Sequence, residues 1–455
     1  MTRSTKFSCL AGVLVALIAG PVFAQDGVPA AAASAGGTTQ EQYVFNTLLF
    51  LIGGFLVMWM AAGFAMLEAG MVRSKNVAMQ CTKNIALYAV AGLAFWLLGY
   101  NLLYPGDDGW VIQDYIGKFY PFSFPEIAQD IGNNTDPGAD YSAGSDWFFQ
   151  MVFCATTASI VSGTLAERIK IWPFVIFVFV LCGIIYPIQC SWQWGAGWLS
   201  NMGFSDFAGS TLVHSVGGWA ALTGAIILGA RKGKFGPNGQ VNPMPGSSMP
   251  LATLGMFILW LGWFGFNGGS QLALGSIENA SSVARIFVNT NMAAAAGTMT
   301  AMVLTQLCYN KVDLTMIING ALGGLVAITA EPLAPAIWQS VLIGSVGGVI
   351  VVFTVPLLDK LGIDDVVGAI PVHLFAGIWG TLVVAWTNSD ASIVTQFTGI
   401  VSIGAFVIVT SAFMWLLLAC TIGLRPTEEE EMDGLDKAEI GLEAYPEFGS
   451  GNLRF

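Results

Sequence analysis

Charged side chains are scarce in this 455-residue chain, because Asp, Glu, Lys and Arg together make up 10% of it, against roughly 25% in soluble domains. So little charge cannot cover the surface of a soluble enzyme. Short segments of alternating polarity, which mark a transmembrane β-barrel, are also missing. The chain instead has 55% hydrophobic residues, enough for about eleven spans of ~20 apolar residues each. The composition therefore predicts an all-α polytopic membrane protein.

The sequence also lacks the machinery of several protein classes. It contains no P-loop and no dinucleotide-binding glycine motif after a strand, so ATP-driven transport and redox chemistry with a cofactor are not indicated. Its seven cysteines form neither a CxxC motif nor a cluster with histidine, so no disulfide framework and no metal site are predicted. An enzyme is the least favoured class, because no pair of nucleophile and base stands out. Transport driven by a gradient remains, without a cofactor or a nucleic-acid partner.

The N-terminus has the pattern of a secretory signal peptide. Arg3 and Lys6 precede an apolar run over residues 9–18, which small residues follow up to Ala24. This pattern predicts a signal peptide over residues 1–24. A short first transmembrane helix is the alternative. Residues 25–42 are polar and rich in Ala and Gly, and we expect them to form an extracytoplasmic segment.

Apolar runs predict about eleven membrane spans within residues 43–423. The spans are residues 43–70, 78–103, 147–166, 172–191, 207–230, 249–273, 282–308, 313–331, 336–358, 365–387 and 394–423. With this arrangement, thirteen Lys and Arg residues, Lys83 among them, fall on one side and two on the other. The positive-inside rule then places the N-terminus outside and the C-terminus inside, with residues 424–455 as an acidic cytoplasmic tail.

The only two histidines of the chain, His214 and His373, lie inside the fifth and tenth predicted spans. Each follows a valine, and each has a glycine four residues later, on the same helix face. Five spans is an odd number, so spans one to five and six to ten would form an inverted 5+5 repeat, followed by a C-terminal helix, with both histidines near the midplane. A buried histidine that merely satisfies its hydrogen bonds in the core is the alternative for each one.

Six segments of the sequence resemble the ammonium transporter (Amt/Mep/Rh) family, and the Amt type within it. They are Asp206–His214, Gly229–Arg231, Ala166–Ile169, Trp194–Gly195, Gly262–Asn267 and, in the acidic tail, Gly434–Asp436. The resemblance covers nearly the whole chain after the signal peptide. It implies a protein that moves ammonium or ammonia across the cell's inner (plasma) membrane for nitrogen uptake.

The resemblance also implies an outer site that recruits the ammonium or methylammonium cation. Its residues here are Trp194, Phe149, Phe153, Ser270 and Asp206. Aromatic faces attract a cation, and a serine oxygen can accept a hydrogen bond from it. Taken without the family, Trp194 is also typical of a membrane-interface belt, the two phenylalanines of bundle packing, and Asp206 of a helix N-cap.

Below that site, the resemblance implies a gate made by Phe153 and Phe266, and a narrow conduit lined by His214 and His373. Apolar walls with few acceptors cannot replace the water shell of K⁺ or Na⁺. Ammonium can instead give up its proton and cross as ammonia. The proton then either returns outside or follows the imidazoles, whose unperturbed pKa of about 6.5 suits a relay.

The family further implies a homotrimer, with a pore in each subunit, and a PII-type regulator that docks on the cytoplasmic face. Two other functions stay open. The chain could be an ammonium sensor that signals through its tail, or a channel for neutral gases of the Rh type. The gas channel is less favoured, because Trp194 and both phenylalanines of the cation site are present.

Overall fold

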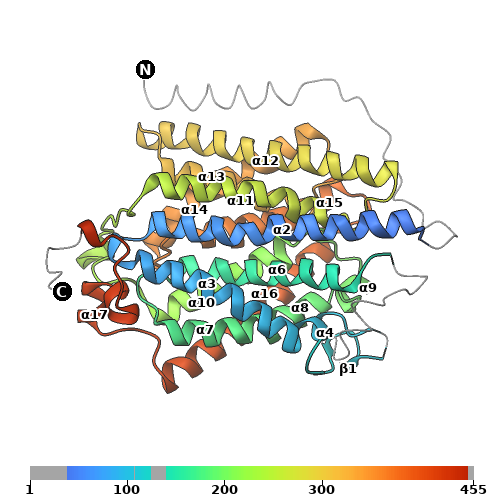
Figure 1. Cartoon of the computed structure of the whole chain (residues 1–455). Coiled ribbons are helices and arrows are strands. Elements are labelled where there is room, and N and C mark those ends of the chain that lie inside the picture. The colour runs from blue at the N-terminus through green and yellow to red at the C-terminus, as the bar shows by residue number, and fades with distance from the viewer. Residues whose placement is uncertain (1–37, 107, 124–139, 449–455) are drawn as a thin grey trace. The chain divides into compact units, whose positions relative to one another are not determined.

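The computed structural model describes residues 38–106, 108–123 and 140–448, which form a bundle of long helices that run side by side (Figure 1). Within these ranges the only strands are β1 (Trp110–Ile112) and β2 (Ile116–Gly117), which pair antiparallel. The predicted signal peptide, residues 1–24, and most of the predicted segment 25–42 lie outside the described residues.

The first half of the chain contributes eight α-helices, some of them continued by π-helical turns. They are α2 (Gln40–Met71), α3 (Val77–Ala94), α4 (Tyr100–Leu103), α6 (Ala143–Thr164), α7 (Ile171–Val180), α8 (Tyr186–Ser191), α9 (Trp198–Asn201) and α10 (Val216–Leu228). The π-helical turn η2 (Phe95–Gly99) joins α3 to α4, and η3 (Leu181–Ile185) joins α7 to α8. A third turn, η4 (Ser210–Ser215), precedes α10. The second half contributes α11 (Met249–Gly269), α12 (Ile277–Tyr309), α13 (Leu314–Ile328), α14 (Ile337–Lys360), α15 (Ala376–Thr387) preceded by η6 (Ile370–Phe375), and α16 (Ile393–Thr421).

Nine helical stretches in the described part of the chain are long and apolar enough to cross a membrane. The predicted spans 147–166 and 313–331 correspond to α6 (Ala143–Thr164) and α13 (Leu314–Ile328), which are not among these nine stretches. Nearly every residue of α6 is buried, and α13 has 15 residues. The chain is therefore a mostly helical, multi-pass membrane protein, while the number of eleven spans stays a prediction.

Glycine allows the helix backbones to pack closely. At Gly255 of α11, a Cβ atom would overlap the backbone nitrogen of Leu67 in α2. At Gly344 of α14, it would overlap the carbonyl oxygen of Ala293 in α12. Association in lipid depends on such close packing, because lipid tails are as apolar as the side chains that would be buried.

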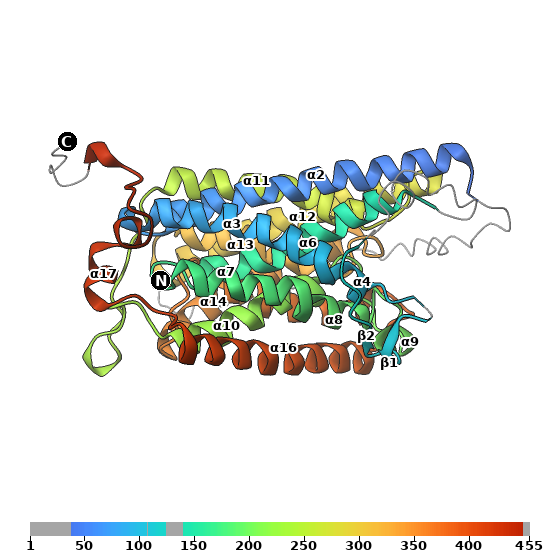
Figure 2. The same cartoon turned by 60° about the horizontal axis from the view of Figure 1, so that its bottom comes forward.

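The two ends of the bundle differ. One end contacts the C-terminal segment from residue 424 to 448, which includes α17 (Glu428–Asp433), and the other end includes β1, β2 and α9 (Figures 1 and 2). We call them the tail end and the hairpin end. The C-terminal segment packs on the bundle through buried acidic groups. The carboxylate of Asp436 accepts hydrogen bonds from the backbone nitrogens of Ala78 (3.0 Å) and Met79 (2.7 Å) at the start of α3.

A buried ion network joins the loops at the tail end. The guanidinium of Arg231 binds both carboxylate oxygens of Asp364, at 2.9 Å each, and Oε1 of Glu167 at 2.8 Å. Burial by itself raises the pKa of Asp364, but the charges of Arg168 and Arg231 outweigh burial and hold that pKa well below its usual range. The network therefore depends on an ionised Asp364.

Candidate functional site

Two helical stretches of the bundle begin in the same unusual way. Asp206 and Asp365 each stand eight residues before a histidine, and each is followed three residues later by a glycine with a positive φ, 102° at Gly209 and 78° at Gly368. A π-helical turn that contains the histidine follows in both stretches. Chain segments 159 residues apart thus share one local structure.

Both carboxylates cap the turn that follows them. The Asp206 carboxylate accepts four backbone N–H bonds, from Gly209 (3.0 Å), Ser210 (2.8 Å), Thr211 (2.8 Å) and Leu212 (2.9 Å). Burial raises the pKa of Asp206 to about 6, although the four N–H bonds act in the opposite direction. The position is a helix cap, as its sequence suggested, but the helical stretch begins at Ser210 rather than at residue 207.

The Asp365 carboxylate has fewer backbone partners. It accepts bonds from the backbone nitrogens of Gly368 (3.2 Å) and Ile370 (2.7 Å), and from the hydroxyl of Thr164 (3.2 Å). The tenth predicted span accordingly begins at Ile370 as a helical stretch, not at residue 365.

The two histidines meet inside the bundle. Their Nδ1 atoms lie 3.2 Å apart, and their ring centroids lie 5.2 Å apart with an angle of 23° between the planes. Both side chains are buried. At this distance one Nδ1 donates a hydrogen bond and the other accepts it, so each ring keeps Nε2 for another partner.

A continuous row of aromatic rings leads to His214 from the hairpin end. Phe149 and Phe153 have centroids 4.6 Å apart, and Phe153 stacks on Phe266 at 3.9 Å. Phe266 in turn stacks on His214 at 5.2 Å. Trp194 contacts the row from the side, edge to face with Phe153 at 6.1 Å.

The polar residues of the predicted outer site lie next to this row. The indole nitrogen of Trp194 donates to the main-chain oxygen of Asp206 at 3.1 Å. Ser270 follows the last turn of α11, and its hydroxyl donates to the main-chain oxygen of Phe266 at 2.8 Å. The hydroxyl oxygen of Ser270 thus keeps its lone pairs for a further donor. The structure therefore brings all eight predicted site residues into one connected set.

Two aromatic neighbours of the histidines were not in the predicted set. Trp263 stacks on His214 at 5.0 Å, with an angle of 17° between the rings, and its indole nitrogen donates to the hydroxyl of Thr329. Phe64 lies 6.3 Å from the ring of His373. The spacing of Trp263 and Phe266, three residues apart on one helix, was the available signal, because such residues share a face.

Lys83 does not belong to a connection, as its charge had suggested. It lies in α3, and its side chain is only 1% exposed. It lies near Glu68 of α2, which is fully buried.

Within the described ranges, no group of three or more His, Cys, Asp or Glu side chains is placed to hold a metal ion.

Comparison with known proteins agrees with this architecture. Residues 48–445 match the model of the Ammonium Transporter Family. The chain is 41% identical to the ammonium transporter Amt2 of Archaeoglobus fulgidus, with 88% of this chain and 87% of that protein covered. It is 39% identical to the putative ammonium transporter sll1017 of Synechocystis, with 91% and 92% covered.

Two solved structures have the same fold. The chain resembles a structure described as a sensor Amt protein with a TM-score of 0.80 and 34% identity, over 88% of this chain and 99% of that one. It resembles Mep2 of Candida albicans with a TM-score of 0.76 and 26% identity, over 92% and 98% of the two chains. The sequence and the fold together show that this chain belongs to the Ammonium Transporter Family, whose members are transporters and not enzymes.

Proposed function

We propose that this protein takes ammonium up across the inner (plasma) membrane, by recruiting the cation at the hairpin end and passing ammonia and a proton separately along the histidine pair. The observation that carries the proposal is the continuous chain of contacts from Trp194 through Phe153 and Phe266 to the paired His214 and His373.

Recruitment depends on Trp194, Phe149, Phe153, Ser270 and Asp206. The aromatic faces attract ammonium or methylammonium, each by about 0.5–2 kcal/mol. The Ser270 hydroxyl points its hydrogen at a main-chain oxygen, so its own oxygen can accept a bond from the cation. The buried Asp206 holds the backbone to which Trp194 is hydrogen-bonded.

The stacked pair of Phe153 and Phe266 acts as the gate, because rings whose centroids are 3.9 Å apart leave no passage until they move. When the gate opens, ammonium gives its proton to Nε2 of His214, which has no hydrogen-bond partner among the described residues, and the resulting ammonia crosses the apolar part of the conduit. The proton passes between the Nδ1 atoms of His214 and His373. Hydrated K⁺ and Na⁺ are excluded, since the walls offer few oxygen ligands in place of water.

The same proposal includes the topology of the chain. Residues 43–423 form eleven spans, as a 5+5 inverted repeat and a C-terminal helix, after cleavage of residues 1–24. The N-terminus lies outside and residues 424–455 inside. The matching caps at Asp206 and Asp365 support the inverted repeat, because each sets a histidine at the same distance along its helix. A homotrimer with a PII-type regulator at the tail end completes the proposal.

An ammonium sensor is the second candidate function. The chain is similar over 88% of its length to a structure described as a sensor Amt protein. The same cation site would then control the C-terminal segment, which contacts the bundle through Asp436 and Glu431. A gas channel of the Rh type is less favoured, because it needs no aromatic cation site.

Currents from reconstituted protein under an ammonium gradient test the proposal. His214→Ala and His373→Ala should each leave a folded protein with a strongly reduced current or with lost exclusion of K⁺. His214→Glu should keep more proton passage than His214→Ala, because a carboxyl group can also carry a proton. Wild-type currents and wild-type ion exclusion in both Ala variants would refute it. A folded wild-type protein that binds methylammonium without any flux would favour the sensor.

A further inference from the structure

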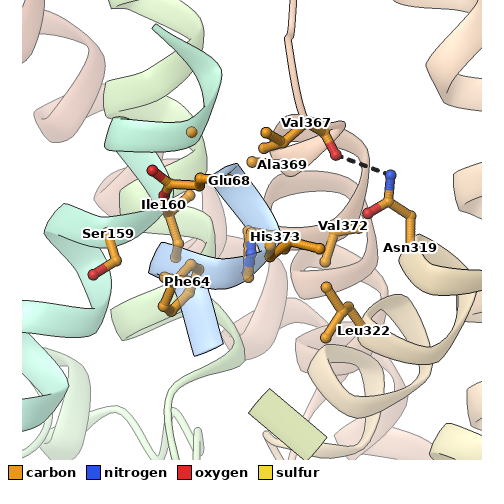
Figure 3. A pocket seen from close by; sticks show the side chains of 12 residues that line it. Phe64, Glu68, Ser159, Ile160, Asn319, Leu322, Val367, Ala369, Val372 and His373 are labelled. Carbon is orange, nitrogen blue, oxygen red and sulfur yellow. Dashed lines mark hydrogen bonds between the residues drawn. The ribbon is translucent and has the colours of Figure 1, made fainter. Parts of the chain in front are cut away.

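A buried carboxylate lies on the tail side of the histidine pair and has no place in the mechanism above. Glu68 is in the last turn of α2 and is fully buried. Together with Phe64 and His373 it lines a cavity of about 10 Å³ (Figure 3). One water molecule needs at least ~10–15 Å³, so the cavity is just large enough for one.

The two oxygens of Glu68 have different surroundings. Oε2 accepts three hydrogen bonds, from Asn84 Nδ2 (2.8 Å), Ser162 Oγ (2.9 Å) and Gln80 Nε2. Oε1 has no hydrogen-bond partner among the described residues, although it is buried. It lies beside Gly163, where a Cβ atom would approach it to 3.5 Å, and Gly163 lines the same cavity. A buried acceptor without a partner is costly, so such a position is a candidate for function.

A buried cation stands beside this carboxylate without contacting it directly. Lys83 Nζ donates to the main-chain oxygen of Ser162 at 2.9 Å and to Gln80 Oε1 at 3.2 Å, and it lies 4.7 Å from the ring centre of Phe174. Gln80 and Ser162 thus connect the two charges. The Lys83 ammonium group compensates the charge of Glu68, and Oε1, which has no hydrogen-bond partner among the described residues, lies beside Gly163 of the cavity lining.

His373 supplies the other side of the cavity. Its Nδ1 faces His214, so Nε2 is the nitrogen through which a proton can leave the pair. We propose that Glu68 is the proton acceptor on the tail side of His373. The proton passes from Nε2 to Oε1 through one water molecule, and the carboxylate becomes a neutral carboxyl group. That group then gives the proton to an ammonia molecule that has passed the histidines, so ammonium re-forms and Glu68 is again ionised.

This inference rests on the proposed function, because it requires a proton on His373. Glu68→Gln tests it, since the glutamine oxygen can keep two of the three bonds now made to Oε2 but the amide cannot take a proton. Glu68→Gln/Lys83→Met removes both buried charges, so that no uncompensated ammonium remains. Glu68→Asp keeps the acid group. Glu331→Gln is the matched control, because Glu331 is also buried, accepts bonds from Ala334 and Asn388, and does not line the cavity.

The measurement is the ammonium-driven current of each variant in proteoliposomes, together with its half-saturation. Glu68→Gln and the double variant should lose the maximal current by roughly tenfold or more, in line with the loss of a positioned acid–base group. Their half-saturation should not change, because the cation site is at the other end of the conduit. Glu68→Asp should keep a substantial part of the current, and Glu331→Gln should match the wild type.

Three results would overturn the inference. They are wild-type current in the double variant, an equal loss in Glu68→Asp and Glu68→Gln, or failure of the double variant to fold, which would assign Glu68 to structure alone. His373→Ala separates this failure from a failure of the proposed function. If His373→Ala loses current and the Glu68 variants do not, only the role of Glu68 is wrong. If His373→Ala also has wild-type current, the histidine conduit itself is wrong.

Discussion

Asp206→Asn should weaken both the stability of the protein and its affinity for the cation. The carboxylate accepts four backbone N–H bonds of 2.8–3.0 Å in a fully buried position. Asparagine offers one oxygen, which can keep at most two of these bonds. A buried donor that loses its acceptor costs about 1–3 kcal/mol, and the loss of an N-cap costs about 0.5–2 kcal/mol. We therefore expect the free energy of unfolding to decrease by about 2–4 kcal/mol.

The weakened helix cap should lower the affinity for the cation through Trp194. The indole of Trp194 is hydrogen-bonded to the main-chain oxygen of Asp206, so a looser cap moves the ring away from Phe153. Loss of one cation–π contact of about 0.5–2 kcal/mol raises the half-saturation for methylammonium by roughly two- to thirtyfold.

The affinity should also depend on pH in the wild type. Burial raises the pKa of Asp206 to about 6, so its negative charge is present above that pH and is lost as the pH falls through it. The half-saturation for methylammonium should consequently increase below about pH 6. Asp206→Asn has no charge at this position to lose and should show a flatter dependence.

Asp365→Asn is the matched control for this prediction. Asp365 caps the equivalent turn with two backbone N–H bonds and one hydroxyl, and it has no link to Trp194. Unfolding followed by tryptophan fluorescence should show a smaller loss of stability than in Asp206→Asn, and methylammonium uptake should keep its half-saturation. An equal increase of half-saturation in both variants, or an unchanged one in Asp206→Asn, would refute the reasoning.

Three further predictions concern the aromatic site and the tail end. Trp194→Leu and, separately, Ser270→Ala should raise the half-saturation for methylammonium without a loss of folded protein, and unchanged uptake curves in both would show that the cation site is assigned wrongly. Arg231→Met should lower the free energy of unfolding by about 3–5 kcal/mol, because the buried carboxylates of Asp364 and Glu167 each lose one of their cations. Because the pKa of Asp364 lies below its usual 3.8, the stability from this ion pair should be complete above pH 3.8 and decrease as the pH falls further. Thermal unfolding between neutral and acidic pH would measure this decrease. Asp436→Ala should release the C-terminal segment, so limited proteolysis after α16 should become faster and flux should change, whereas equal proteolysis would show that other contacts hold the segment.

The helices could be predicted from the sequence because burial in lipid requires long apolar runs. The run predicted over 43–70 is α2, residues Gln40–Met71. The starts of the helical stretches around the two histidines were predicted less well, at 207 and 365 instead of Ser210 and Ile370. Hydropathy cannot show which backbone N–H groups a neighbouring carboxylate satisfies, and these caps determine where the turns begin.

The candidate site was predictable where the residue type is rare or the motif is specific. His214 and His373 are the only histidines of the chain, and Phe266 lies in a segment that resembles the family. Glu68 and Lys83 were missed for a different reason. They lie near the ends of apolar runs, where a charge usually belongs to a connection, and the sequence does not indicate that Gln80, Asn84 and Ser162 supply hydrogen bonds inside the bundle.

The two segments that hold the histidines are alike in backbone but unlike in the surroundings of the histidines, and this difference would give the proposed conduit a direction. In both segments an Asp is followed by a Gly three residues later and by Val-His seven and eight residues later. His214, however, stacks on Phe266 and Trp263, whose aromatic faces adjoin the proposed cation site. His373 borders a cavity that it shares with the carboxylate of Glu68. A symmetric pair of imidazoles alone has no preferred direction for a proton, since donor and acceptor can exchange. With the proposed cation site on the side of His214 and the proposed acceptor Glu68 on the side of His373, a proton has one neighbour when it enters the pair and a different one when it leaves.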